Sequence, residues 1–263
     1  REVWDDRGLG GVPRGGPHVK VLDYILERVA RGKVHMTLID PDKQDPAAAR
    51  DLSAMACAAG TDGIMVGGST GVTQEKVDES VRSSKAGATV PVILFPSGAS
   101  GLSRHADAVY FMSLLNSRSP RLIVGEQQQA ARAIQLWGLE PIPMAYLIVE
   151  PGMRAGEVGE ANPIPRSNPE EAVRWALTAQ YFGMHLVYLE AGSGAPEPVP
   201  TEMVRAVKTA IQVPLIVGGG IRSPAIGAEI AKAGADILVT GTFVEKTRDP
   251  HALRNLIAAV KSA

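Results

Sequence analysis

Three glycine-rich segments carry the clearest chemical signal in this sequence. Each one follows a short apolar, β-branched run and precedes a helix-like pattern, so its glycines lie where strands end and helices begin. Glycine lets backbone N–H groups approach an anion closely, and the N-terminus of the following helix adds partial positive charge. Three such segments in succession predict a phosphate-binding pocket: residues 188–194 (YLEAGSG), 217–221 (VGGGI) and 239–242 (VTGT).

Glu190 lies inside the first glycine-rich segment, two residues after Tyr188. A carboxylate would repel a phosphate there unless an uncharged group, such as a hydroxyl, lies beside the phosphate. Glu190 would then accept hydrogen bonds from substrate hydroxyls or take a proton from one of them. The alternative is a structural ion pair with a nearby arginine. Tyr188 is either part of the site or a core aromatic with its hydroxyl in water.

Asp40 ends the first apolar run of the sequence and is followed by Pro41, Asp42 and Lys43. A carboxylate at this place suits Mg²⁺, which proteins bind partly through substrate phosphates. Ser69, after the two glycines that end the second apolar run, would offer a hydroxyl to the same ion. Asp42 also has a simpler interpretation as a turn residue, as Asp45 has as a helix cap.

Eight apolar runs of strand length recur along the chain, separated by amphipathic stretches. They are continuous rather than alternating, as expected for parallel strands buried on both faces. Eight strand–helix units in about 240 residues predict a (β/α)8 TIM barrel, with the active site at the carboxyl ends of the strands. Six or seven strands would also fit an open doubly wound sheet. The runs cover residues 34–39, 63–66, 92–95, 108–115, 142–149, 186–189, 215–217 and 237–239.

Two features modify the regular barrel. An amphipathic stretch before the first run, with Val21, Ile25 and Val29 on one face, is predicted to close the barrel's bottom. The linker of residues 96–107 (PSGASGLSRHAD) is too short and too rich in glycine for a covering helix with two loops. We therefore expect the helix after the third strand to be missing or replaced by a short loop. That leaves an apolar groove, with these expected lining residues: Phe95, Val109, Phe111, Leu114 and Leu115.

The composition excludes several classes of function. With 27 Lys and Arg against 28 Asp and Glu, the net charge of -1 argues against a nucleic-acid-binding protein. No apolar run approaches the roughly 20 residues that span a bilayer. The histidines lack the spacing of zinc ligands, and Cys57 alone forms no internal disulfide. Residues 1–17 lack the apolar core of a secretory signal, so we expect a flexible tail before a single cytoplasmic domain of residues 18–263.

Residues 38–43 (LIDPDK), 66–69 (VGGS) and 95–97 (FPS), taken with the three glycine-rich segments, form a recognisable set. In this set the sequence resembles the geranylgeranylglyceryl phosphate synthases, archaeal TIM-barrel prenyltransferases that make the first ether bond of membrane lipids. The resemblance implies Mg²⁺ as cofactor and two substrates, sn-glycerol 1-phosphate and geranylgeranyl diphosphate. The prenyl group would be joined to the C3 hydroxyl of the glycerol, with release of diphosphate.

The resemblance also assigns individual residues. Asp40 and Ser69 match the Mg²⁺ positions of the family, and Asp40 and Glu190 match its catalytic carboxylates. The family lacks the helix after the third strand, and it forms homo-oligomers, in which Trp137 is either an interface anchor or half-buried packing. A donor that comes from the membrane implies transient membrane contact. The residues that match the glycerol-phosphate site are Tyr188, Leu189, Glu190, Ala191, Gly192, Ser193, Gly194, Gly219, Gly220, Gly241 and Thr242.

Other functions remain open from the sequence. A heptaprenylglyceryl phosphate synthase-like enzyme with a longer donor shares most of these motifs. A sugar-phosphate isomerase of the phosphate-binding TIM-barrel type fits Asp40 and the last two glycine-rich segments, but not the open barrel wall. A phosphate-binding module without catalytic activity does not account for a carboxylate at Glu190.

Overall fold

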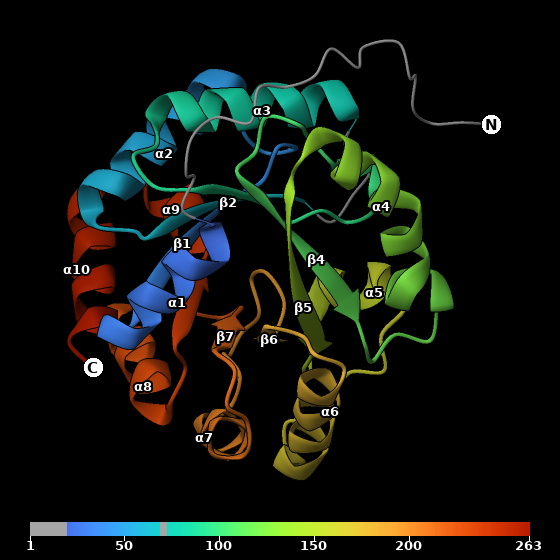
Figure 1. Cartoon of the computed structure of the whole chain (residues 1–263). Helices are drawn as coiled ribbons and strands as arrows, with labels where there is room; N and C mark the ends of the chain where they lie inside the picture. The colour runs from blue at the N-terminus through green and yellow to red at the C-terminus, as the bar shows by residue number, and fades with distance from the viewer. Residues whose placement is uncertain (1–19, 69–72) are drawn as a thin grey trace.

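The computed structural model describes residues 20–68 and 73–263, which form a closed parallel barrel with the strands in chain order (Figure 1). Val34 pairs with Ile237 where the first strand meets the last, so the barrel prediction is confirmed and the open sheet is excluded. Residues 1–17 and Ser69 lie outside the described residues. The strands are β1 (Val34–Ile39), β2 (Gly63–Val66), β3 (Val92–Leu94), β4 (Ala108–Leu114), β5 (Glu140–Ile148), β6 (Leu186–Glu190), β7 (Leu215–Gly218) and β8 (Ile237–Thr240).

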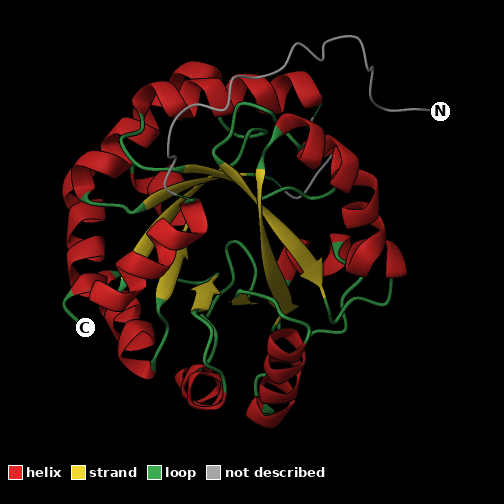
Figure 2. Cartoon of the chain, viewed as in Figure 1, coloured by secondary structure: helices red, strands yellow, loops and turns green. Residues whose placement is uncertain are grey.

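Outer helices surround the barrel as a ring (Figure 2). Local sequence sets their ends: the Asp45 side chain accepts a hydrogen bond from the Ala48 N–H, and Pro46 occupies the first helical turn. Asp45 is thus the helix cap of its simpler interpretation. The outer helices are α2 (Pro46–Ala59), α3 (Gln74–Gly87), α4 (Glu126–Trp137), α6 (Pro169–Tyr181), α7 (Thr201–Ala210), α8 (Pro224–Ala233) and α10 (Pro250–Lys261), with the short α5 (Met153–Val158) and α9 (Thr242–Thr247) in the loops after β5 and β8.

Helix α1 (Val21–Arg31) closes the amino-terminal end of the barrel and lies inside the ring of outer helices (Figure 1). Ile25 is fully buried and packs with the inward-facing residues of the strands, such as Met36. The Glu140 carboxylate, at the start of β5, accepts hydrogen bonds from the N–H groups of Val21 (2.6 Å) and Leu22 (3.1 Å). The predicted plug of the barrel is confirmed.

At this same end of the barrel, aspartate carboxylates accept hydrogen bonds from the N–H groups of neighbouring strands. Asp236, just before β8, accepts the Leu215 N–H of β7 at 2.8 Å and forms an ion pair with Lys208 at 2.5 Å. The β5–β6 pair is different, because Pro143 has no N–H to donate and His185 takes the aspartate's position. The same arrangement joins Asp62 to the His35 N–H and Lys261, and Asp107 to the Val92 N–H and Lys85.

The unit between β3 and β4 lacks an outer helix, as predicted. Only a single 3-10 turn, Ala99–Gly101, interrupts the linker. The β3–β4 ladder consists of Ile93 with Ala108 and Leu94 with Val109, whereas β4 pairs with β5 over its full length. Residues 110–114 of β4 therefore extend past the last partner in β3, and the barrel wall opens at the carboxyl end of these strands.

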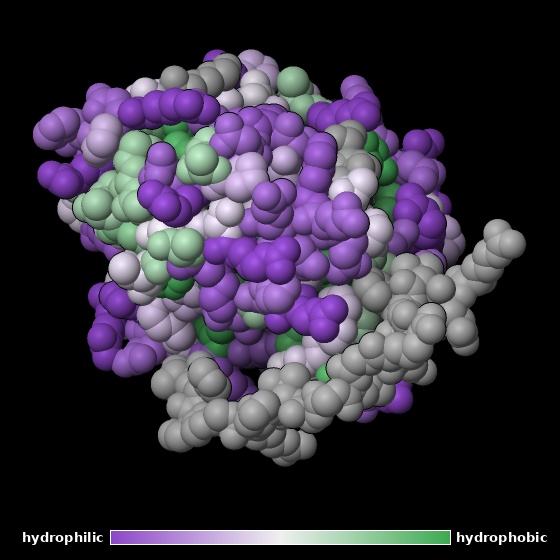
Figure 3. Space-filling view, turned by 90° about the horizontal axis from the view of Figure 1, so that it is seen from above, coloured by the Kyte–Doolittle hydropathy of each residue, from purple (hydrophilic) through white to green (hydrophobic). Residues whose placement is uncertain are grey.

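The face seen from above, over α3, is mostly hydrophilic (Figure 3). Within the described part of the chain, no helix is both long and apolar enough to cross a membrane. Trp137 at the end of α4 is half-buried against the core. The Arg104 guanidinium lies over the Trp137 ring, with Cζ 5.9 Å from the ring centroid. Trp137 is thus half-buried within one chain, and its role as an interface anchor stays a prediction. Exposed charged residues on α3 include Glu75, Lys76, Glu79, Arg82 and Lys85.

Candidate active site

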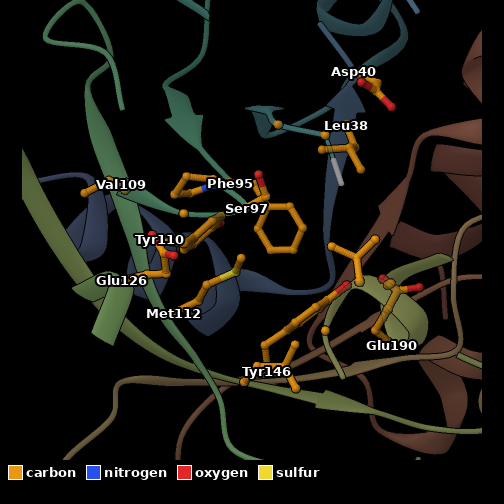
Figure 4. Close-up of a pocket in the computed structure, with 18 of the residues that line it drawn as sticks. Leu38, Asp40, Phe95, Ser97, Val109, Tyr110, Met112, Glu126, Tyr146 and Glu190 are labelled. Atoms are coloured by element: carbon orange, nitrogen blue, oxygen red, sulfur yellow. The ribbon is translucent and has the colours of Figure 1, made fainter. Parts of the chain in front are cut away.

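A cavity of about 470 Å³ opens at the carboxyl ends of the strands and continues through the open barrel wall. In Figure 4, Asp40 and Glu190 lie on one side of it and Val109 and Glu126 on the other, with Phe95 between them. The predicted carboxylates, part of the glycine-rich region and the predicted groove thus share one continuous space.

Glu190 ends β6 and is 7% exposed. Its Oε1 accepts a hydrogen bond from the Gly192 N–H at 2.6 Å, and the Tyr188 hydroxyl donates to the same carboxylate. Burial raises the pKa of Glu190, and these two hydrogen bonds lower it, so that the pKa stays above its ordinary value. Within the described residues Glu190 forms no ion pair, and burial, Tyr188 and Gly192 set its pKa, so the arginine alternative finds no support there.

The second glycine-rich segment fits closely around this carboxylate. A Cβ on Gly219 would lie 2.4 Å from Oε1 of Glu190, and the φ angle of +81° favours glycine as well. A Cβ on Gly218 would lie 2.2 Å from the Tyr188 hydroxyl. These glycines therefore make room for the Tyr188–Glu190 pair. Tyr188 itself is fully buried, so its hydroxyl is not in water.

The first and third glycine-rich segments meet through two hydroxyls. Ser193 Oγ lies 2.9 Å from Thr242 Oγ1, at the start of the short helix α9. A short extra helix after the eighth strand is a common part of phosphate sites in TIM barrels. Of the predicted glycerol-phosphate residues, those in the cavity wall are Glu190, Ser193, Gly241 and Thr242.

The other predicted glycerol-phosphate residues lie behind or beside this wall. Leu189 and Ala191 are buried in the core outside the barrel, so only their backbones can serve the site. The remaining residues support the loops without lining the cavity: Tyr188, Gly192, Gly194, Gly219 and Gly220.

Asp40 is the carboxylate that could hold a metal ion. Its Oδ1 accepts the Asp42 N–H at 3.0 Å, which confirms the turn, and its Oδ2 lies 3.3 Å from Nζ of Lys43. A Cβ on Gly68 would lie 2.5 Å from Oδ1, so glycine keeps this carboxylate accessible. The described residues contain no group of three His, Cys, Asp or Glu side chains that could hold a metal. Asp40 therefore fits Mg²⁺ bound by one carboxylate and by substrate phosphate oxygens.

Aromatic side chains line the cavity between the two carboxylates. The Tyr146 ring, from β5, packs edge-on against Phe95 (5.3 Å between centroids) and Tyr188 (5.1 Å). Its hydroxyl points toward Glu190 in Figure 4, and burial together with the Glu190 charge raises the pKa of Tyr146 well above its ordinary value. Sequence reasoning missed Tyr146, because only the inward register of β5 distinguishes it from other core residues.

The groove in the open wall is lined by residues from both sides of β4. Val109 and Phe111 face outward toward Ala130 and Ile134 of α4. Leu115 was wrongly expected in this groove: it packs with Ala145 and Leu147 on the outer face of β5. The α4 and α5 parts of the lining were not predicted. The other apolar lining residues are Leu102, Met112, Leu114, Leu122, Ala155 and Val158.

Similarity to known proteins agrees with this geometry. The model of the PcrB family matches residues 27–261. The chain is 53% identical over 243 residues to a geranylgeranylglyceryl phosphate synthase of Pyrococcus horikoshii, covering 92% of this chain and 96% of the relative. The crystal structure of (S)-3-O-geranylgeranylglyceryl phosphate synthase from Thermoplasma acidophilum, in complex with its substrate sn-glycerol-1-phosphate, is also similar. It is 46% identical with a TM-score of 0.91 and covers 94% of this chain and 100% of that one.

A more distant likeness supports the fold alone. The tryptophan synthase alpha chain from Legionella pneumophila is 17% identical, with a TM-score of 0.61. By contrast, the close relatives match nearly the whole chain at about half identity. The chain therefore belongs to the PcrB family, together with the geranylgeranylglyceryl phosphate synthases.

Proposed function

We propose that this chain is a Mg²⁺-dependent prenyltransferase that joins geranylgeranyl diphosphate to the C3 hydroxyl of sn-glycerol 1-phosphate. The products are geranylgeranylglyceryl phosphate and diphosphate. The observation that carries the proposal is the single cavity that connects the Glu190–Ser193–Thr242 region, the Asp40 carboxylate and an apolar groove. An acceptor with a phosphate and hydroxyls, a charged leaving group and a long apolar tail each match one part of it.

The acceptor phosphate fits the backbone N–H groups of the glycine-rich segments and the hydroxyls of Ser193 and Thr242. Its glycerol hydroxyls would then face Glu190, the one carboxylate among the glycine-rich segments. The sn-glycerol-1-phosphate bound to the relative from Thermoplasma acidophilum supports this acceptor.

Glu190 is suited to take the proton from the C3 hydroxyl. In the reaction, the C3 oxygen forms a bond to C1 of the donor, the bond from C1 to the diphosphate oxygen breaks, and the hydroxyl proton leaves. Because burial raises the pKa of Glu190, the carboxylate is a stronger base than an exposed one. The Gly192 N–H and the Tyr188 hydroxyl hold the carboxylate in position.

The donor spans the other two parts of the cavity. Asp40 would hold Mg²⁺, which when bound supplies positive charge to the leaving diphosphate. The prenyl tail would lie between β4 and α4, where each buried CH₂-sized group stabilises the complex by up to about 0.8 kcal/mol. Phe95 and Tyr146 would exclude water from C1, so that the glycerol hydroxyl rather than water attacks it.

The direct test uses labelled sn-glycerol 1-phosphate and geranylgeranyl diphosphate, with Mg²⁺ or with excess EDTA. We expect label in the organic phase only with Mg²⁺, and little label with sn-glycerol 3-phosphate. Faster transfer from a thirty-five-carbon donor would support the heptaprenylglyceryl phosphate synthase-like alternative. Turnover of a sugar phosphate without any prenyl transfer would support the isomerase and overturn the proposal.

Assembly and location belong to the same proposal. We propose a cytoplasmic homo-oligomer that contacts the membrane transiently to obtain its lipid donor. Light scattering after size-exclusion chromatography will give the oligomeric state. Sedimentation with lipid vesicles, with and without donor in the bilayer, will test the membrane contact; binding that does not depend on the donor would contradict transient contact.

A further inference from the structure

Lys43 lies between two carboxylates at the mouth of the cavity. Its Nζ is 3.3 Å from Oδ2 of Asp40, after β1, and 3.4 Å from Oε2 of Glu245, in α9 after β8. The Asp40 and Glu245 side chains are 15% and 14% exposed, whereas that of Lys43 is 50% exposed. A single movable cation therefore bridges two largely buried anions.

The charges explain why a lysine is needed here. Among the described residues, the ion pairs of Asp40 and Glu245 are those with Lys43, so without Lys43 this described part of the cavity would face a diphosphate with two unpaired carboxylates. The Lys43 ammonium group places one positive charge against both carboxylates.

The same contact creates a conflict with a metal ion. Because Oδ1 of Asp40 already accepts the Asp42 N–H, Oδ2 is the less engaged oxygen, and Lys43 covers it. A divalent cation bound to Oδ2 would repel the Lys43 ammonium group, because Nζ lies 3.3 Å from that oxygen. Glu245 offers Lys43 a second partner, so the ammonium can leave Asp40 and stay in the cavity.

We propose that Lys43 is an internal counter-ion that occupies the cation position at Asp40 before the metal binds and then pairs with the donor diphosphate. This inference rests on the proposed function, because it requires a metal at Asp40 and a diphosphate beside it. Lys43 would thereby neutralise the two carboxylates in the free enzyme and the leaving group in the complex. Nothing about the fold requires this lysine, since its side chain is half exposed.

The test measures binding rather than turnover. Mn²⁺ affinity is determined by electron paramagnetic resonance on the full chain, without substrates, for wild type and for Lys43→Met. Removal of a competing exposed cation should tighten Mn²⁺ binding roughly two- to fivefold. At saturating Mn²⁺, the affinity for inorganic diphosphate, measured by calorimetry, should fall about tenfold, because a charge-assisted contact is lost. A structural defect would weaken both affinities, so opposite changes identify the counter-ion role.

Three variants make the result decisive. Lys76→Met removes the same charge from a lysine that lies 4.0 Å from Asp42 and outside the cavity wall, and Lys43→Arg keeps the charge; both should bind Mn²⁺ as wild type does. Unchanged or weaker Mn²⁺ binding in Lys43→Met, or equal tightening in Lys76→Met, overturns the inference alone. Asp40→Ala should lose Mn²⁺ binding. If wild type fails to bind Mn²⁺ both alone and with inorganic diphosphate present, the metal site of the proposed function fails, and the inference fails with it.

Discussion

The hydroxyl oxygens of Ser193 and Thr242 lie 2.9 Å apart and join two loops that are 49 residues apart in the sequence. Both side chains line the cavity, and β7, which ends just before Gly219, lies between β6 and β8. The contact therefore joins two loops that border the space in which the acceptor phosphate is proposed to bind.

Removal of this contact should weaken acceptor binding. In Thr242→Val the side chain keeps its shape but loses its hydrogen bond to Ser193 and to the phosphate. We expect KM for sn-glycerol 1-phosphate to rise about tenfold, the scale of a hydrogen bond to a charged group, with KM for the donor unchanged. Steady-state kinetics with each substrate varied in turn will show this. Equal changes in both KM values would place the contact outside the acceptor site.

Glu190→Gln should separate catalysis from stability. As the proposed proton acceptor, Glu190 should account for about a 10²-fold or larger effect on kcat/KM. Its pKa is raised in the folded protein, so the folded state loses stability as pH rises through that pKa and the buried carboxyl group ionises. Near neutral pH, Glu190→Gln should therefore keep or raise Tm while activity falls. A lower Tm with near-normal kcat/KM would mean that the carboxylate is structural.

The pH dependence of wild type provides an independent check on Glu190. The base must be ionised, so kcat/KM should increase with pH through an apparent pKa above that of an ordinary glutamate. The Glu190→Gln variant should lose this ascending limb. An ascending limb that survives in the variant would belong to another group.

Asp40→Ala should abolish Mg²⁺-dependent turnover and leave the fold intact. The Asp40 side chain accepts the Asp42 N–H and pairs with Lys43, which is half exposed and has Glu245 as a second partner, so little stability should depend on it. Loss of the ion should remove several kcal/mol of leaving-group stabilisation. Circular dichroism will report the fold, and kcat at saturating Mg²⁺ will report the chemistry; near-normal kcat would contradict the metal assignment.

Much of the fold follows from the sequence, because buried parallel strands and their helices leave unmistakable periodic patterns. Such sequence patterns predicted helix α1 at the bottom of the barrel, the Asp45 helix cap and the missing outer helix after β3. The site could be predicted where its residues end a strand or follow one directly, as Glu190 and Asp40 do. Tyr146 and the Lys43–Glu245 contact depend on barrel register and on a long-range approach, for which single-sequence patterns carry no signal. Leu115 was misplaced because the outer faces of β4 and β5 contribute to different clusters.

The aspartates at the amino-terminal end should affect stability without affecting catalysis. Asp236→Ala leaves the Leu215 N–H and Lys208 without their partner, which should cost about 1–3 kcal/mol of unfolding free energy. His185→Asp places an aspartate at the equivalent position of β6 but should gain little, because Pro143 has no N–H to donate. Urea unfolding and kcat/KM on the same preparations will test both variants. A gain in His185→Asp as large as the loss in Asp236→Ala would show that charge, rather than the N–H contact, matters.

The groove predicts how activity depends on donor length. A tail between Phe111 of β4 and Ala130 of α4 gains free energy with every buried carbon, so a five-carbon allylic diphosphate should be a far poorer donor than geranylgeranyl diphosphate, mostly through KM. Ala130→Phe should fill the groove where Ala130 is now buried, and so should raise KM for the twenty-carbon donor while sparing the five-carbon one. The comparison uses one acceptor concentration and the two donors, with Tm confirming that the larger ring is tolerated. If kcat/KM were independent of length in wild type, the tail would not use this groove, and the opening beside β3 would need another explanation.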